Sequence, residues 1–326
     1  WRVAMRDQGR RSEAQVTVLA WSDLVRSSMQ LGVAATYVAL FRTAWIYIST
    51  GALMRLARLR KGPMLAALLP VVVLLGGLVT TIAVTLGAAY WVGWWLALPA
   101  GLGVCAAVRA LDRKVYASYL MQDYAFSAKE YGAYPDALEH RLAVFAQAIQ
   151  EIDDVDEILI VGHSSGAYLA VSMMADLLRA GPRDGPHLSL LTLGQVVPMV
   201  SLLPKANRLR DDLAQLAAER QITWVDVSAP GDGCSFALTD PVTVSGVHVQ
   251  DQVWPLVLSA AYSQTLSPDR LARLRHRYFR LHFQYLCAFD DPTRYDYFAI
   301  TAGAVSLRER FSGRRPSPSR LQSFAA

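Results

Sequence analysis

The longest uncharged stretch of the chain, residues 62–108, limits the possible folds more than its overall composition does. As one helix it would be about 70 Å long, at about 1.5 Å per residue. The hydrocarbon core of a bilayer is about 30 Å thick, so a single span cannot contain it. We therefore expect two spanning helices, Met64–Leu86 and Tyr90–Val108, with Gly87–Trp95 forming the turn. The alternative is a buried hairpin in a globular core, although soluble cores seldom need so long an uncharged run.

Basic and aromatic residues accompany this apolar stretch. Positive charges stand on both of its flanks, and the positive-inside rule then places both ends of the hairpin in the cytoplasm. The stretch is too long and too far inside the chain to be a signal peptide. We therefore expect an integral protein of the inner (cytoplasmic) membrane. The residues concerned are Arg55, Arg58, Arg60, Lys61, Arg109, Arg113 and Lys114 on the flanks, and Tyr90, Trp91, Trp94 and Trp95 as an aromatic belt.

The composition agrees with a membrane protein and excludes several other classes. Hydrophobic residues make up 53% of the chain, and the mean hydropathy is +0.24. The formal net charge is +5, and the basic excess lies near the apolar segments and at the C-terminus. This distribution suits an anionic membrane surface better than nucleic acid. Three scattered cysteines, Cys105, Cys234 and Cys287, are too few for a disulfide framework or a zinc site.

The segment before the hairpin is expected to contain one strand and one helix. Gln15–Ala20 is rich in β-branched and apolar residues and indicates a strand. Leu31–Met54 is uncharged except for Arg42, and an arginine at the centre of a span costs about 2.5–3.5 kcal/mol. We therefore expect an amphipathic or interfacial helix there, with a third span as the alternative. The chain starts with Trp1 rather than Met, so we expect the natural N-terminus to lie upstream.

A strand, a tight turn and a helix follow one another in the middle of the chain. Ile158–Val161 is short and β-branched, as expected of a buried parallel strand. Gly162–Gly166 is a G-x-S-x-G motif with Ser164 at its centre. Apolar residues then recur at helical spacing until a Gly-Pro pair ends the helix. This order of elements is the context that a nucleophile elbow requires.

The residue types of the motif suit nucleophilic catalysis. Ser164 would stand on a sharp turn at the end of the strand, where flanking glycines remove Cβ atoms that would clash. The backbone N–H of Ser165 would lie at a helix N-terminus and donate to a developing oxyanion, helped by the helix dipole. His163 and Ser165 fill the variable positions of the motif, so we assign neither side chain a catalytic role.

From Tyr116 to Gly303 the chain resembles the α/β-hydrolase superfamily, specifically its lipases and esterases. The resemblance implies a mostly parallel sheet with helices on both faces, and a serine hydrolase that requires neither a metal nor an organic cofactor. Strands and helices are expected to alternate, as a parallel sheet demands. The expected elements are helices at Pro135–Gln150, Ala206–Arg220 and Arg270–Leu286, and strands at His187–Val197, Gln221–Ser228 and Pro255–Tyr262.

The resemblance implies a catalytic acid in the loop beyond a later strand. Asp232 occupies the loop that follows the strand ending near Ser228, where such an acid belongs. Two other carboxylates remain open as alternatives. Asp226 lies inside that strand, and Asp240 precedes a proline in the following loop.

The resemblance also implies a histidine base nearer the C-terminus. His282 is a single imidazole among apolar and aromatic neighbours, which suits a base that is held by packing. His248 and His276 remain open as alternatives. A histidine that merely fills a core position is the competing explanation for His282.

One feature departs from the family pattern. The oxyanion hole needs a second N–H, and no glycine-rich loop of that kind lies between Trp1 and Ser164. We expect this donor upstream of Trp1, and we expect the sheet edge beside the elbow strand to have no neighbouring strand in this chain.

We thus expect four parts: an N-terminal segment (1–61), the membrane hairpin (62–110), a hydrolase domain facing the cytoplasm (111–311) and a disordered tail (312–326). The expected activity is cleavage of a hydrophobic carboxylic ester, such as an acyl lipid, by Ser164, Asp232 and His282. An acyltransferase or thioesterase could use the same triad. A non-catalytic membrane scaffold with a hydrolase-like fold is the alternative of a different class. Membrane lipids are expected partners, and nucleic acid is not.

Overall fold

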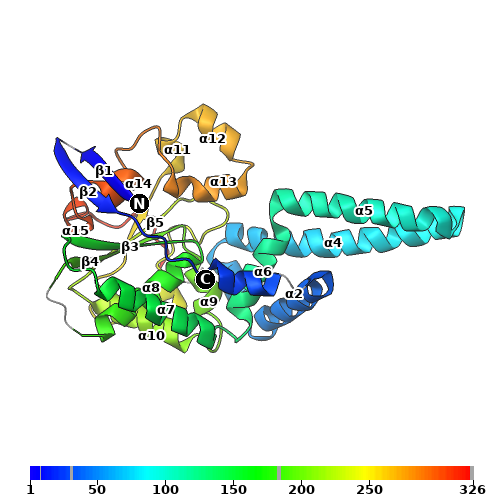
Figure 1. Ribbon diagram of the computed structural model, residues 1–326, viewed down its shortest axis with the longest axis horizontal. Helices are drawn as coiled ribbons and strands as arrows, with labels where there is room; N and C mark the ends of the chain where they lie inside the picture. Colours follow the sequence, from blue (N-terminus) through cyan, green and yellow to red (C-terminus); the bar gives the residue numbers. More distant parts are fainter. Residues whose placement is uncertain (8, 30–31, 182–184, 324–326) are drawn as a thin grey trace.

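The computed structural model describes the chain except for residues 8, 30–31, 182–184 and 324–326. A body of strands and helices forms one end of the molecule, and two long helices, α4 (Lys61–Val92) and α5 (Trp94–Val115), project from it (Figure 1). The body is α/β, because a parallel sheet lies inside it and helices pack on both faces of the sheet.

Within the described residues, the central sheet is 4-stranded and its neighbouring strands are parallel, in the order β3-β4-β5-β6. Every residue of β5 is buried, which explains why these strands consist largely of apolar residues. The expected strands are present with shifted ends. The first expected strand after the motif, His187–Val197, stops at Leu193, because a Pro-containing helix begins at Val197. The strands are β3 (Glu157–His163), β4 (His187–Leu193), β5 (Thr223–Ser228) and β6 (Leu256–Ser259).

The two faces of the sheet pack against different layers. Leu190 of β4 belongs to the core on one face of the sheet, whereas its neighbour Leu191 belongs to the core on the opposite face. This follows from the alternation of side chains along a strand. One layer contains α7 (Asp136–Gln150), α8 (Gly166–Arg179) and α10 (Asn207–Ala218), and the other contains α13 (Tyr278–His282), η2 (Phe283–Leu286), α14 (Tyr297–Ala302) and α15 (Leu307–Arg310).

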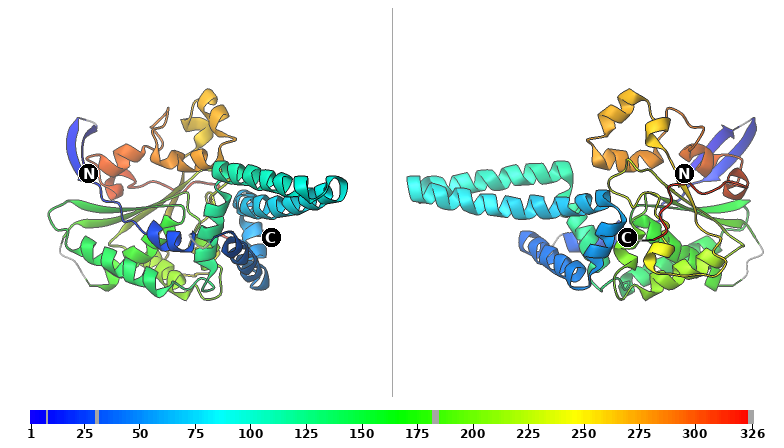
Figure 2. Two further views of the ribbon diagram at one scale, coloured as in Figure 1. Left: turned by 45° about the vertical axis from the view of Figure 1, so that its right-hand side comes forward. Right: turned by 180° about the vertical axis from the view of Figure 1, so that it is seen from behind.

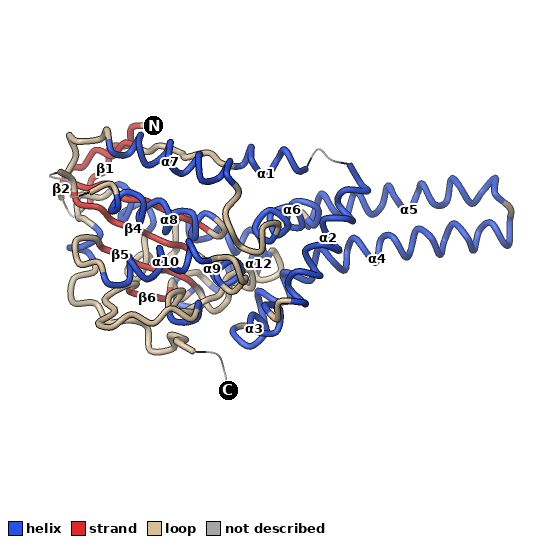
Figure 3. The backbone as a smooth tube through the Cα atoms, turned by 90° about the horizontal axis from the view of Figure 1, so that it is seen from below, coloured by secondary structure: helices blue, strands red, loops and turns tan. Residues whose placement is uncertain are grey.

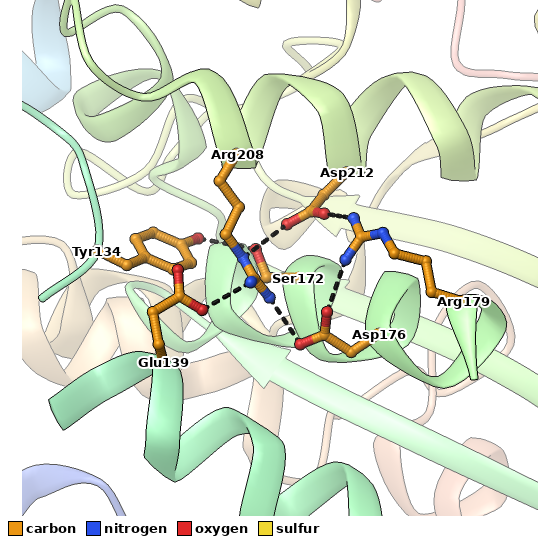
Figure 4. A network of polar contacts seen from close by, with 7 residues as sticks. All are labelled: Tyr134, Glu139, Ser172, Asp176, Arg179, Arg208 and Asp212. Atoms are coloured by element: carbon orange, nitrogen blue, oxygen red, sulfur yellow. Dashed lines mark hydrogen bonds and ion pairs between the residues drawn. The ribbon is translucent and has the colours of Figure 1, made fainter. Parts of the chain in front are cut away.

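A network of ion pairs fastens the helices of the first layer together (Figure 4). Arg208 of α10 lies 2.6 Å from Glu139 of α7 and 2.6 Å from Asp176 of α8. Arg179 of α8 bonds both Asp176 and the fully buried Asp212 of α10. A pocket of about 530 Å³ opens beside this network, and neither Ser164 nor the other candidate catalytic residues line it. We therefore assign the network to stability.

The two projecting helices lie side by side, antiparallel, beyond the strands (Figures 2 and 3). Both are long and apolar enough to cross a membrane, and few of their residues are buried within the protein. Large side chains such as Leu65 and Leu102 are each 70% exposed, which argues against a buried globular hairpin. The turn is tighter than the expected Gly87–Trp95, because helix continues to Val92 and Gly93 alone, at φ 84°, reverses the chain.

The segment expected to be one amphipathic helix, Leu31–Met54, contains a break. Leu31 lies outside the described residues, and the rest forms α2 (Gly32–Ser49) and the start of α3 (Ala52–Leu59), separated at Gly51, where φ is 70°. One face of α2 packs on the body, and Arg42 donates to the Lys129 carbonyl at 3.0 Å. The opposite face exposes an apolar stripe of Val38, Phe41, Trp45 and Ile48, each at least 58% exposed.

The prediction of an N-terminal strand at Gln15–Ala20 is wrong. The strands are β1 (Arg2–Asp7) and β2 (Arg10–Gln15), which form a separate antiparallel pair beside α14. Pairing across the tight turn at Gly9 decides their position. Val16 extends the pairing by hydrogen bonds with Trp1, whereas the described residues 17–20 form no strand despite their largely apolar composition. Among the described residues no strand pairs with the outer edge of β3, as expected from the sequence.

Two expectations for the C-terminal third also need correction. Arg270–Leu286 is not one helix but α12 (Pro268–Leu274), α13 and η2, with a break after Leu274. The described part of the tail is not disordered. Ser317 donates its N–H to Val257 at 2.9 Å, and Leu321 forms a bridge with Thr239, because β6 and its neighbouring loop offer unpaired backbone groups. The remaining elements are α1 (Ser22–Met29), α6 (Ala117–Ala128), α9 (Val197–Ser201), α11 (Tyr262–Thr265) and η1 (Thr243–Ser245).

Candidate functional site

Ser164 stands on a strained turn between β3 and α8. Its φ of 57° is in the left-handed region, which costs energy for a residue with a side chain. A Cβ on Gly162 would come within 2.6 Å of the Gly166 carbonyl oxygen, so only glycine fits there. The Ser164 N–H donates to the Leu193 carbonyl at 3.0 Å, which ties the turn to β4. The sequence therefore produces the strand, turn and helix of an elbow at the predicted residues.

The residue after the nucleophile candidate begins the helix. Ser165 is the N-cap of α8, and the first N–H groups of a helix have no intrahelical acceptor. Its backbone N–H is thus placed to stabilise negative charge on a group that is bonded to Ser164, as expected.

Asp232 follows β5 and is buried at 2% exposure. One carboxylate oxygen accepts the Cys234 N–H at 2.9 Å, and the other accepts from His282 Nδ1 at 2.8 Å and from the Tyr285 hydroxyl at 3.0 Å. Burial would raise the pKa of Asp232, but the charge and hydrogen bond of His282 outweigh burial and hold it below its ordinary value. Asp232 is therefore ionised at neutral pH.

His282 ends α13 and is buried at 4% exposure. Because the Asp232 carboxylate accepts, Nδ1 of His282 carries a proton, and Nε2 is the ring nitrogen that does not face the carboxylate. Gly194, at φ 51°, leaves the space that the ring occupies, since a Cβ there would lie 3.2 Å from His282 Cε1. The imidazole is thus oriented by a buried carboxylate, which is the arrangement that a general base requires.

The His282 ring lies beside the elbow. Its centroid is 4.5 Å from that of His163, the residue before Ser164, and His163 Nε2 donates to the His282 carbonyl at 3.0 Å. Burial, followed by the proximity of His282, lowers the pKa of His163 to about 3, so His163 is neutral. Within the described residues the Ser164 hydroxyl makes no hydrogen bond to His282. In free enzymes such bonds are often long and tighten when substrate binds.

The alternative acids and bases lie elsewhere. Asp226 accepts from the Thr192 hydroxyl at 2.6 Å inside the core, and Asp240 accepts the Val242 N–H at 3.0 Å in its own loop. His248 and His276 are exposed, and no ion pair joins either to a carboxylate among the described residues. The structure therefore brings Asp232 and His282 together and leaves the four alternatives apart from them.

Three side chains at the site were not assigned from the sequence. His163 packs on His282, and Tyr285 donates to Asp232. Asp123 of α6 accepts from the Ser165 hydroxyl at 2.7 Å. Burial raises the pKa of Asp123 to about 6, although the bond from Ser165 opposes the increase. In the sequence, Asp123 could have been noticed as a lone carboxylate in an apolar and aromatic segment. No sequence signal marks Tyr285.

A metal centre at the same residues is less consistent with these contacts. Ligand atoms of Asp232, Cys234 and His282 lie within 4.8 Å of one another. However, the Asp232 oxygen and the His282 nitrogen nearest each other are already joined by a hydrogen bond, and Tyr285 donates to that same oxygen. Burial, then Asp232, raises the pKa of Cys234 to about 12, which keeps the thiol protonated. The donor set therefore favours an acid–base pair.

Comparison of the chain with models of known protein families, with curated proteins and with solved structures finds no match. Function is therefore inferred from the chemistry of the site.

Proposed function

We propose that this protein is a membrane-anchored serine hydrolase of the α/β-hydrolase type that cleaves a hydrophobic carboxylic ester. The observation that carries the proposal is Ser164 on a left-handed strand-to-helix turn, where the preceding residue, His163, packs on a histidine whose Nδ1 is held by a buried carboxylate. A serine without those neighbours is a poor nucleophile at neutral pH.

The topology supports the same proposal. Ser164 follows β3, Asp232 follows β5 and His282 follows β6, and in a parallel sheet the segments after the strands begin at one edge. Serine, acid and histidine thus occur in the chain order of α/β-hydrolases.

In the proposed reaction, Ser164 attacks the ester carbonyl while His282 Nε2 accepts the serine proton. The Ser165 N–H donates to the oxyanion, and Asp232 stabilises the imidazolium that forms. His282 then gives the proton to the leaving alcohol, which departs and leaves an acyl group on Ser164. Water, deprotonated by His282, attacks the acyl carbonyl and regenerates the serine with release of the acid. Acyl transfer to an alcohol, or cleavage of a thioester, would use the same residues.

The position of the hairpin supports a hydrophobic substrate. A Cβ on Gly62, at the start of α4, would lie 3.2 Å from Gly233 Cα, next to Asp232. At the other end of the hairpin, Tyr116 packs against Phe279 of α13 at 5.4 Å between ring centroids. If α4 and α5 cross the bilayer, the loop of the acid and the helix of the base lie at its surface. An acyl lipid could then enter from the leaflet that the basic flanks face, which we propose is the cytoplasmic one.

Covalent labelling tests the assignment of the nucleophile. Full-length protein in detergent micelles should react with a fluorophosphonate probe at Ser164, and the Ser164→Ala and His282→Ala variants should not. His276→Ala, an exposed histidine in the same region, is the matched control and should react as the wild type does. Labelling that survives in Ser164→Ala would remove this assignment.

A non-catalytic scaffold is the second candidate. The missing Ser164–His282 hydrogen bond in the described structure favours it, as does the lack of an identified second oxyanion donor. A scaffold would not react with the probe in any variant, whereas a hydrolase would react and turn over an ester.

A further inference from the structure

The segment that carries His282 has an unusual surface. Between Arg273 and Arg280, four arginines are exposed, and no ion pair joins any of them to a carboxylate among the described residues. A fifth, Arg270, lies 3.1 Å from Asp290 and is thereby neutralised. We call residues 273–283 the arginine cap; its exposed arginines are Arg273, Arg275, Arg277 and Arg280.

Exposed aromatic side chains accompany these charges. Tyr278 is 58% exposed and Phe283 is 49% exposed, although both stand in the segment whose other residues enclose the buried His282. Arginine and aromatic side chains together are typical of surfaces that meet the headgroup region of a bilayer. A surface exposed only to water would not need the two large rings.

The arginine cap lies beside the base of the hairpin (Figures 1 and 2). Phe279 contacts Tyr116, the residue that follows α5, and Tyr278 lies against Gly233, where α4 begins to pack. Arg109, Arg113 and Lys114 end α5 at the same place. The cap is therefore continuous with the charged end of the apolar helices, where phosphate groups of lipids would be found.

We propose that the arginine cap binds the headgroups of anionic lipids in the leaflet that surrounds the hairpin. This inference rests on the proposed membrane anchorage. Guanidinium groups match phosphate oxygens with two parallel hydrogen bonds, and exposed arginines without carboxylate partners are free to form them. The anionic lipids hold α13 against the membrane and so keep His282 and its segment in place at the site. The partner is a lipid surface rather than free phosphate.

Melting temperature gives a readout that does not depend on catalysis. Full-length protein in zwitterionic detergent is titrated with phosphatidylglycerol or with phosphatidylcholine. Wild type should melt several degrees higher with phosphatidylglycerol, because a ligand of the folded state raises its stability. A basic residue near an anionic surface strengthens binding about fivefold, so removal of four should weaken it about 600-fold before screening by salt. The variant with all four cap arginines changed to glutamine should therefore lose the shift.

A second variant controls for total charge. Arg2, Arg6, Arg10 and Arg11 lie on the β1–β2 pair, at the end of the molecule away from the hairpin (Figure 1). Their replacement by glutamine removes the same charge and should leave the shift intact. If both variants lose the shift equally, net charge rather than the cap binds the lipid, and the proposal is overturned. If the fourfold cap variant does not fold, Arg273→Gln with Arg280→Gln should reduce the shift partially, and an unchanged shift there overturns the proposal.

Two further measurements test whether the ligand is a lipid and whether the protein is a hydrolase. Glycerol phosphate at matched phosphate concentration, or heparin at matched anionic charge, should give less stabilisation than phosphatidylglycerol; equal stabilisation would indicate a site for any polyanion. Probe labelling of Ser164 is measured on the same samples. A lipid-dependent shift in melting temperature without labelling would refute the hydrolase proposal and support lipid binding by the arginine cap. Labelling without such a shift would support the hydrolase proposal and refute lipid binding by the cap.

Discussion

The Asp123–Ser165 hydrogen bond makes a sharp test of the elbow, because it holds the residue whose N–H is the proposed donor to the oxyanion. Asp123 Oδ2 accepts from Ser165 Oγ at 2.7 Å, and one turn later Ser127 lies 3.3 Å from the Tyr168 hydroxyl of α8. Both contacts join α6 to the first turns of α8. Loss of the first should therefore loosen the elbow without unfolding the body.

The size of the effect follows from the bond that is removed. Hydrogen bonds to charged groups contribute about 1.5–3 kcal/mol, which corresponds to about 10- to 150-fold in rate if the whole of it is lost in the transition state. Asp123→Ala should thus slow fluorophosphonate labelling of Ser164 by about 10- to 100-fold. Asp123→Asn keeps an oxygen acceptor for Ser165 and should label within about fivefold of wild type.

Both variants also remove a carboxyl group whose titration affects stability. Burial raises the pKa of Asp123 to about 6, above its ordinary 3.8. A carboxyl that binds its proton more tightly when folded contributes stability at low pH, and this is lost as pH rises from about 4 to about 6. Asp123→Asn should remove that loss, measured as melting temperature at pH 5 and pH 7. Labelling of Asp123→Ala at the wild-type rate, with equal folded fractions, would refute the role given to this bond.

Three other changes have defined outcomes. Asp232→Asn should leave the melting temperature near that of wild type and lower ester turnover by about 10⁴-fold, as for the equivalent change in a serine protease; an undiminished rate would remove the acid. Burial raises the pKa of Asp226 to about 7, so wild type should lose stability as pH rises from about 4 to 7. The difference in unfolding free energy between Asp226→Asn and wild type, measured by urea unfolding, should shift by about 3 kcal/mol in favour of the variant from pH 5 to pH 8. An equal difference at both pH values would contradict this. Arg208→Ala leaves Asp212 and Asp176 partly unpaired and should cost about 3–5 kcal/mol of unfolding free energy, whereas Arg141→Ala, at an exposed ion pair, should cost much less; a cost for Arg208→Ala no larger than that for Arg141→Ala would contradict the assignment of the network to stability.

Local patterns explain what the sequence could predict. The elbow depends on residues within one strand, one turn and one helix, so Gly162, Ser164 and the start of α8 follow from neighbours in the chain. The later strands are mostly buried, and the apolar residues of β4 and β6 identify them. The pairing of Asp232 with His282 could be anticipated only from chain order in a resembling family, since 50 residues separate them.

Long-range contacts explain what the sequence could not predict. The Asp123–Ser165 bond joins residues 42 apart that lie on different helices, and no periodicity marks it. The strand at Arg10–Gln15 exists because Gly9 turns the chain back onto β1, although its composition is polar. The described part of the tail is ordered because Ser317 pairs with β6, a contact that its Arg-, Ser- and Pro-rich composition does not indicate.

The corner at Tyr116, where φ is 56°, joins the end of α5 to the start of α6 without an intervening loop. α6 also packs along α4 and holds Ser165 through Asp123. A hairpin whose apolar length exceeds the thickness of the surrounding bilayer responds by tilting. With no loop to absorb it, a tilt of α4 and α5 is transmitted to α6 and hence to the turn that carries Ser164. If the hairpin spans the membrane as proposed, the acyl-chain length of the host membrane acts mechanically on the turn that carries Ser164, the proposed nucleophile.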